Sequence, residues 1–152
     1  MEFARQQYKY DFSGMVADIL WPARTGYGSG DENSNSLVMS VDIKDNKFLF
    51  TGDIDSGAEN DIIKSGADVD ADVLKSAHHG SGDSSSDSFL LKVSPEFAVI
   101  CVGNGNPYGH PHEEMLARLE NSGSKVLRTD QMGDIKFTID LFGNMRVDYE
   151  TK

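Results

Sequence analysis

Residues 71–81 read ADVLKSAHHGS, a short apolar run that ends in two adjacent histidines. The arrangement recurs downstream, where the apolar run FAVICV at 97–102 is followed by YGHPH at 108–112. Upstream, FLFTGD at 48–53 is an apolar run that ends in an acidic side chain. Short unbroken apolar runs are typical of strands in the buried sheets of α/β proteins, which place ligands at the strand ends. These stretches therefore predict an α/β fold with its chemistry at a sheet edge.

The rest of the chain alternates between strand and helix patterns. Residues 37–43 are apolar at every second position, which is the period of a half-buried strand. The clearest helix pattern begins at Pro111, has acidic residues in its first turn and ends at Asn121, before Gly123. We expect strands at 16–21, 37–43, 48–51, 73–77, 97–102, 126–128, 135–141 and 145–149, and helices at 56–65, 86–93 and 111–121. This order predicts a mixed sheet with flanking helices and a hairpin near each end.

Length and composition indicate one soluble globular domain of 152 residues. No apolar stretch is long enough to cross a membrane, and the N-terminus lacks the apolar segment of an export signal. The net charge of −11 repels phosphate backbones, so a nucleic acid would have to be held locally. The single cysteine, Cys101, excludes an internal disulfide and a cysteine-rich zinc site.

All four histidines fall in two short segments, 78–79 and 110–112. Both segments follow predicted strands, and so does Asp53. Imidazole and carboxylate groups are ligands that zinc and manganese accept when thiolates are absent. The competing interpretation is a set of exposed loop histidines, because loops collect polar residues in any case.

Six ordered segments resemble the metallo-β-lactamase fold, specifically its branch in ComEC-type DNA-uptake (competence) proteins. They are ILWP at 19–22, ENSNSLV at 32–38, FTGD at 50–53, ADVLKSAHHGS at 71–81, YGHPH at 108–112 and LRTD at 127–130. The resemblance covers about residues 16 to 140 in the same order as the family. An ordered set of this kind is more specific than any one of its members.

The resemblance implies a four-layer αββα sandwich with two metal ions, zinc or manganese. It places Asp53 at the metal-bridging carboxylate and His78 at a metal ligand, with His79 turned toward the substrate. His110 would contact the substrate as a phosphate ligand or an acid, at a helix N-cap, whereas His112 is expected to be solvated. In such a site a bridging water loses a proton near neutral pH and attacks a phosphoryl or acyl centre.

One family motif is absent. No histidine precedes His78, so the first metal-binding motif, His-x-His-x-Asp-His or its reduced form Asp-x-Asp-His, is missing. The chain is therefore expected to be a single domain fragment over 1–152. Residues 1–15 would be a leader or an appended segment, and residues 16–150 the C-terminal half of the sandwich. The expected partners are the N-terminal half of the same domain and, without it, a second copy of this chain in a homo-oligomer.

The expected function is that of a metal-dependent hydrolase domain of the phosphodiesterase or nuclease type, in a ComEC-like competence protein that internalises DNA. DNA or another phosphodiester would be the substrate of the complete domain, and the fragment alone is expected to be inactive. The alternative is a degenerate module that uses the fold for binding or regulation without turnover. The resemblance places the domain at the extracytoplasmic face of a bacterial membrane protein, with no membrane insertion by this segment.

Overall fold

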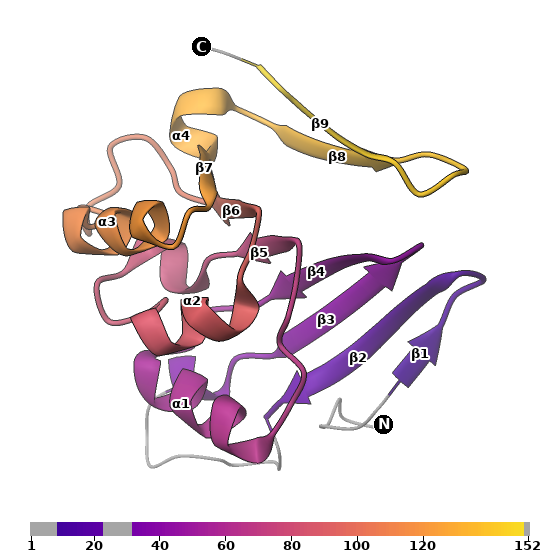
Figure 1. The fold of residues 1–152 in the computed structure, drawn as a ribbon. Helices are drawn as coiled ribbons and strands as arrows, with labels where there is room; N and C mark the ends of the chain where they lie inside the picture. Colours follow the sequence, from indigo (N-terminus) through magenta and orange to yellow (C-terminus); the bar gives the residue numbers. More distant parts are fainter. Residues whose placement is uncertain (1–8, 23–31, 151–152) are drawn as a thin grey trace.

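The computed structural model describes residues 9–22 and 32–150 (Figure 1). Its centre is a seven-stranded sheet in which the strands lie in chain order. The strands are β1 (Lys9–Asp11), β2 (Met15–Trp21), β3 (Val38–Ile43), β4 (Asn46–Phe50), β5 (Val73–Lys75), β6 (Phe97–Ile100) and β7 (Lys125–Arg128). Pairing is antiparallel from β1 to β4 and parallel from β4 to β7. The carboxyl ends of β4 to β7 therefore meet at one edge.

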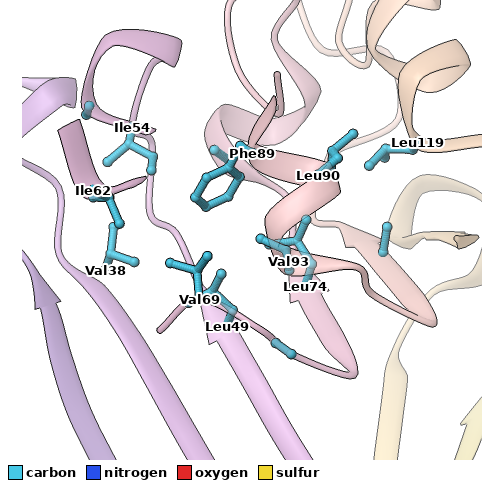
Figure 2. Close-up of a cluster of buried hydrophobic side chains, with 14 of the residues drawn as sticks. Val38, Leu49, Ile54, Ile62, Val69, Leu74, Phe89, Leu90, Val93 and Leu119 are labelled. Carbon is cyan, nitrogen blue, oxygen red and sulfur yellow. The ribbon is translucent and has the colours of Figure 1, made fainter. Parts of the chain in front are cut away.

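Three helices cover one face of this sheet (Figure 1). They are α1 (Ser56–Ser65), α2 (Asp87–Val93) and α3 (Glu113–Asn121), and short helical turns lie at η1 (Asn33–Asn35), η2 (Ala77–Gly80) and α4 (Thr129–Met132). Figure 2 shows the apolar side chains that fill the space between helices and sheet. Leu49 lies beside Val69, and Leu74 lies beside Val93 of α2; all four are buried.

Helix α1 shows how local sequence sets the helix boundaries. The Asp55 carboxylate accepts a hydrogen bond from the Ala58 N–H at 2.8 Å and so caps the first turn. Gly66 ends the helix at a φ of 76°, a left-handed conformation that glycine adopts without strain. The predicted bounds 56–65 are confirmed.

The opposite face of the sheet carries the hairpin of β8 (Ile135–Ile139) and β9 (Met145–Tyr149). Phe137 packs edge-on against Phe48 and Phe97, with both ring-centroid distances 5.7 Å. The hairpin turn is tied to the β3–β4 turn, because the Asn46 side-chain amide donates to the Gly143 carbonyl at 2.9 Å. The hairpin therefore forms a partial third layer.

This third layer leaves part of the sheet face uncovered. An apolar groove of about 600 Å³ runs beside β8, and its walls include Phe12, Met15, Met39 and Phe50. We call it the sheet-face groove. Phe12 is 57% exposed and Phe50 is 40% exposed, so apolar rings face solvent there.

The α/β class, the mixed sheet, the flanking helices and both hairpins are confirmed. The sheet also includes Lys9–Asp11, within the segment expected to be a leader. Helix α3 begins at Glu113, two residues later than predicted, because His112 is extended and donates its N–H to the Gly80 carbonyl at 2.9 Å. Among the described residues, no helix combines the length and hydrophobicity needed to cross a bilayer.

Candidate functional site

The candidate site lies at the edge where β4, β5 and β6 end. Asp53 follows β4, the histidines 78 and 79 follow β5, and the segment 108–112 follows β6. These strands are parallel neighbours, so their carboxyl ends present loops to the same side. The structure thus brings together the residues that the sequence singled out from three separate stretches.

The turn that carries Asp53 is held by hydrogen bonds to β5. The Thr51 hydroxyl donates to the Lys75 carbonyl at 2.6 Å. The Gly52 carbonyl accepts from the His78 N–H at 3.1 Å and from the Lys75 ammonium at 3.0 Å. Gly52 has a φ of 56°, and a Cβ there would lie 2.7 Å from the Ser36 Cβ. Only glycine fits, so the placement of Asp53 depends on this residue.

Both adjacent histidines adopt left-handed backbone conformations. The φ angles are 47° at His78 and 55° at His79, inside the short turn η2. Such conformations cost about 1–3 kcal/mol for a non-glycine residue and concentrate at functional sites. Here they bring both rings to the sheet edge, with ring centroids 6.5 Å apart.

His79 directs one ring nitrogen at Asp53. Its Nδ1 lies 2.7 Å from the Cys101 carbonyl oxygen, which can only accept, so Nδ1 carries the hydrogen. In the neutral ring, Nε2 then presents a lone pair, and it lies 3.6 Å from the Asp53 Oδ1. Two electron-pair donors therefore lie side by side at the sheet edge. In histidine metal ligands, the ring nitrogen that does not bind the metal usually donates to a carbonyl or carboxylate, which fixes the imidazole tautomer.

His110 and His112 complete a cluster of four imidazoles. The His110 ring lies 5.7 Å from the His78 ring and 4.8 Å from the His112 ring. Burial, and then the charge that the neighbouring histidines would carry, lower the pKa of His110 below its ordinary value. His110 is therefore a neutral ring that can accept or donate a hydrogen bond at neutral pH.

Two expectations about this segment are wrong. The N-cap of α3 is His112, not His110, because the helix begins at Glu113. His112 is also more than a solvated side chain, since its Nδ1 accepts a hydrogen bond from the Gly82 N–H at 2.9 Å. His112 therefore anchors the loop that follows the histidine pair.

Two charged side chains hold the loop 81–86 against the helices through hydrogen bonds to its backbone. Glu59 of α1 is fully buried, and its carboxylate accepts hydrogen bonds from the backbone N–H groups of Ser85 and Ser86. Burial raises the pKa of Glu59 despite these bonds. Arg118 of α3 donates to the carbonyls of Gly82, Ser84 and Ser85. The network therefore holds the loop that directly follows the turn with His78 and His79.

Sequence reasoning did not identify these supporting residues. The sequence does contain an indication that Glu59 is buried. Glu59 lies three residues before Ile62, on the apolar side of the helix predicted at 56–65. Lys75 is indicated in the same way, because it is a charged residue at the end of an apolar strand. Burial lowers the pKa of Lys75 below its ordinary value, against the opposing effects of Cys101 and Asp53. Gly52 is recognisable only from its three-dimensional surroundings.

The described residues fit part of a metal site and do not complete one. Asp53 and His79 supply two donors, yet no group of three or more His, Cys, Asp or Glu side chains converges within residues 9–22 and 32–150. A closed zinc site has four ligands, and a catalytic one has three from the protein.

Comparisons with curated proteins find relatives that are much longer than this chain. ComE operon protein 3 of Bacillus subtilis is 36% identical over 106 residues, which are 70% of this chain and 14% of that protein. Competence protein ComA of Neisseria gonorrhoeae is 38% identical over 135 residues, 88% of this chain and 19% of that protein. Recombination protein 2 of Haemophilus influenzae is 37% identical over 105 residues, 69% of this chain and 13% of that protein. No family model matches the chain.

Proposed function

Because the chain is related in sequence to a segment of the competence proteins, we propose that it acts in DNA uptake as part of a metal-dependent phosphodiesterase or nuclease. The observation that carries the proposal is the convergence of Asp53 and His79, whose Oδ1 and Nε2 atoms lie 3.6 Å apart within a cluster of four histidines. The chain spans less than a fifth of the length of these relatives. The hydrolase would therefore be the longer protein.

We further propose that the fold is the C-terminal half of a metallo-β-lactamase sandwich. Helices cover one face of the seven-stranded sheet, and the other face carries one hairpin and the sheet-face groove. In an αββα sandwich this second face packs against another sheet. The N-terminal half of the same domain would supply that sheet and the missing ligands. In a competence protein the domain would lie at the extracytoplasmic face of the membrane.

The proposed roles follow the geometry. Asp53 would bind metal together with one of the two adjacent histidines, zinc or manganese being suited to these ligands. The resemblance points to His78 as that histidine, while the directed Nε2 lone pair favours His79. His110 would contact the phosphodiester, since it lies in the same cluster as a neutral ring.

The test uses the full-length protein and a fluorescent single-stranded oligonucleotide. Asp53→Ala is expected to lower the hydrolysis rate by at least about a hundredfold, because Asp53 would be the carboxylate that binds both metal ions. His79→Asn should lower it more than His78→Asn. His112→Ala serves as the comparison within the same cluster and should retain more activity than Asp53→Ala. Equal losses at Asp53 and His112 would contradict the assigned roles.

A binding module without turnover is the second candidate. The observation that favours it is the incomplete ligand set among the described residues. The full-length protein discriminates between the two candidates. Binding of the oligonucleotide without cleavage, in the presence of zinc or manganese, would support the binding module and contradict the hydrolase.

A further inference from the structure

Tyr108 stands at the rim of a cavity that opens from the histidine cluster. The cavity has a volume of about 380 Å³, and its walls include His79, Val102, Gly103 and Thr129. Tyr108 is 75% exposed, so most of this residue is accessible to a ligand. One of its faces stacks on His110, with ring centroids 5.8 Å apart and an interplanar angle of 30°. Its other face is open to solvent.

The loop that presents Tyr108 is held in place by Asn106. The Asn106 side-chain oxygen accepts hydrogen bonds from the backbone N–H groups of Tyr108, at 3.2 Å, and His110, at 3.0 Å. Its amide nitrogen donates to the His110 carbonyl at 2.7 Å. A single side chain thus spans the loop. The ring is therefore set on a preformed support, which reduces the entropy lost when a ligand binds.

We propose that Tyr108 is a stacking platform for one base of a single-stranded nucleic acid, an inference that rests on the proposed function. Bases stack on exposed aromatic rings with little sequence preference. Bases of a duplex have no free face, so the platform selects single strands. Because the net charge of −11 repels the phosphates, affinity has to come from uncharged contacts of this kind.

The position of the platform suits the proposed hydrolysis. Tyr108 and His79 line the same cavity, and His79 also faces Asp53. A base on the open face of Tyr108 would direct its phosphodiester into the cavity, toward His79. Tyr108 would then set which strand, and which phosphate along it, reaches the site.

The experiment measures binding of a fluorescein-labelled deoxythymidine oligomer to the 152-residue chain at low salt by fluorescence anisotropy. Tyr108→Ala is expected to weaken binding about five- to 150-fold, the measured range for loss of one stacked base. Tyr108→Phe should retain binding, because the ring face remains. Phe142→Ala is the matched control, since Phe142 is 91% exposed in the distant β8–β9 turn. A second oligomer of the same length carries the sugar-phosphate backbone without bases. We expect the unsubstituted 152-residue chain, called the parent chain, to bind this second oligomer as weakly as Tyr108→Ala binds the deoxythymidine oligomer.

The outcomes separate this inference from the proposed function. Normal binding by a folded Tyr108→Ala variant, checked by circular dichroism, would overturn the platform and leave the hydrolase proposal standing. Equal binding of the two oligomers would overturn the platform in the same way. If the parent chain binds neither oligomer, the platform is overturned, while the hydrolase proposal is decided separately by the Asp53 series.

Discussion

The Lys75 ammonium group donates a hydrogen bond to the Gly52 carbonyl at 3.0 Å, beneath the turn that carries Asp53. The same carbonyl accepts the N–H of His78. One carbonyl oxygen therefore joins the ends of β4 and β5, and it couples the position of the acidic side chain to that of the histidine pair. The geometry of the candidate site depends on this backbone contact as much as on the side chains themselves.

Gly52→Ala is expected to destabilise the chain by about 2–4 kcal/mol. A Cβ at this position would meet the Ser36 Cβ at 2.7 Å and the Leu37 carbonyl oxygen at 3.2 Å. Gly66→Ala is the matched control, because Gly66 also has a positive φ but has no atom within 4 Å of the added Cβ. Its cost should be about 1 kcal/mol, from backbone strain alone. Urea unfolding measures both, and equal losses would show that contact with Ser36 is unimportant.

Glu59→Gln is expected to lower the free energy of unfolding by about 1–3 kcal/mol, because an amide leaves one buried backbone N–H without an acceptor. The N–H groups concerned are those of Ser85 and Ser86. Glu120→Gln on the exposed side of α3 should change stability by less than about 0.5 kcal/mol. The two variants are compared by urea unfolding at neutral pH. A stable Glu59→Gln variant would contradict a structural role for the network.

Asp130 should contribute a pH-dependent part of the stability. Two hydrogen bonds from Arg128, at 2.7 and 3.1 Å, lower the pKa of this carboxyl below its ordinary value of 3.8. Since the folded pKa is the lower one, the stabilisation is present above pH 3.8 and is lost as the pH falls through the folded pKa. Asp130→Asn should cost about 1 kcal/mol at neutral pH. That difference from the parent chain should shrink at about pH 3, and a constant difference would contradict the linkage.

Zinc and manganese are expected to bind weakly to the 152-residue chain. Asp53 and His79 offer two ligands, and described side chains do not add a third. Elemental analysis after dialysis should therefore find much less than one metal ion per chain. Tight stoichiometric metal would contradict the incomplete site. In that case, His79→Asn and His78→Asn would identify the histidine that holds it.

Self-association through the sheet-face groove is expected at micromolar concentration. The groove exposes apolar rings, and each 100 Å² of apolar surface that a second copy covers contributes about 2.5 kcal/mol. Salt screens the repulsion due to the net charge of −11. Phe12→Glu should return the chain to a monomer. Leu91→Glu, at a residue that is 80% exposed on α2, should leave association unchanged. Light scattering that finds a 16.7 kDa species for the parent chain would contradict this prediction.

Most of the fold could be predicted because its signals are local. Helix α1 has its cap at Asp55 and its stop at Gly66, and the β8–β9 hairpin has alternating apolar residues around Gly143. Helix α3 was predicted to begin two residues too early. Pro111 is a good first residue of a helix, but the hydrogen bond from His112 to Gly80 keeps this segment extended. That bond joins residues far apart in sequence, so the local pattern could not reveal it.

The sequence by itself determined the α/β class, the succession of strands and helices along most of the chain, and the four histidines and one aspartate that gather at the sheet edge. Hydrophobic periodicity and turn residues involve only a few neighbouring positions, so they can be recognised in the sequence alone. Only the tertiary structure decided which ring nitrogen faces Asp53, how Glu59 and Arg118 hold the loop, and which face of the sheet stays uncovered. Those features depend on left-handed backbone at His78 and His79 and on contacts between distant strands and helices. These contacts form only when the chain folds, so no local sequence pattern reveals them.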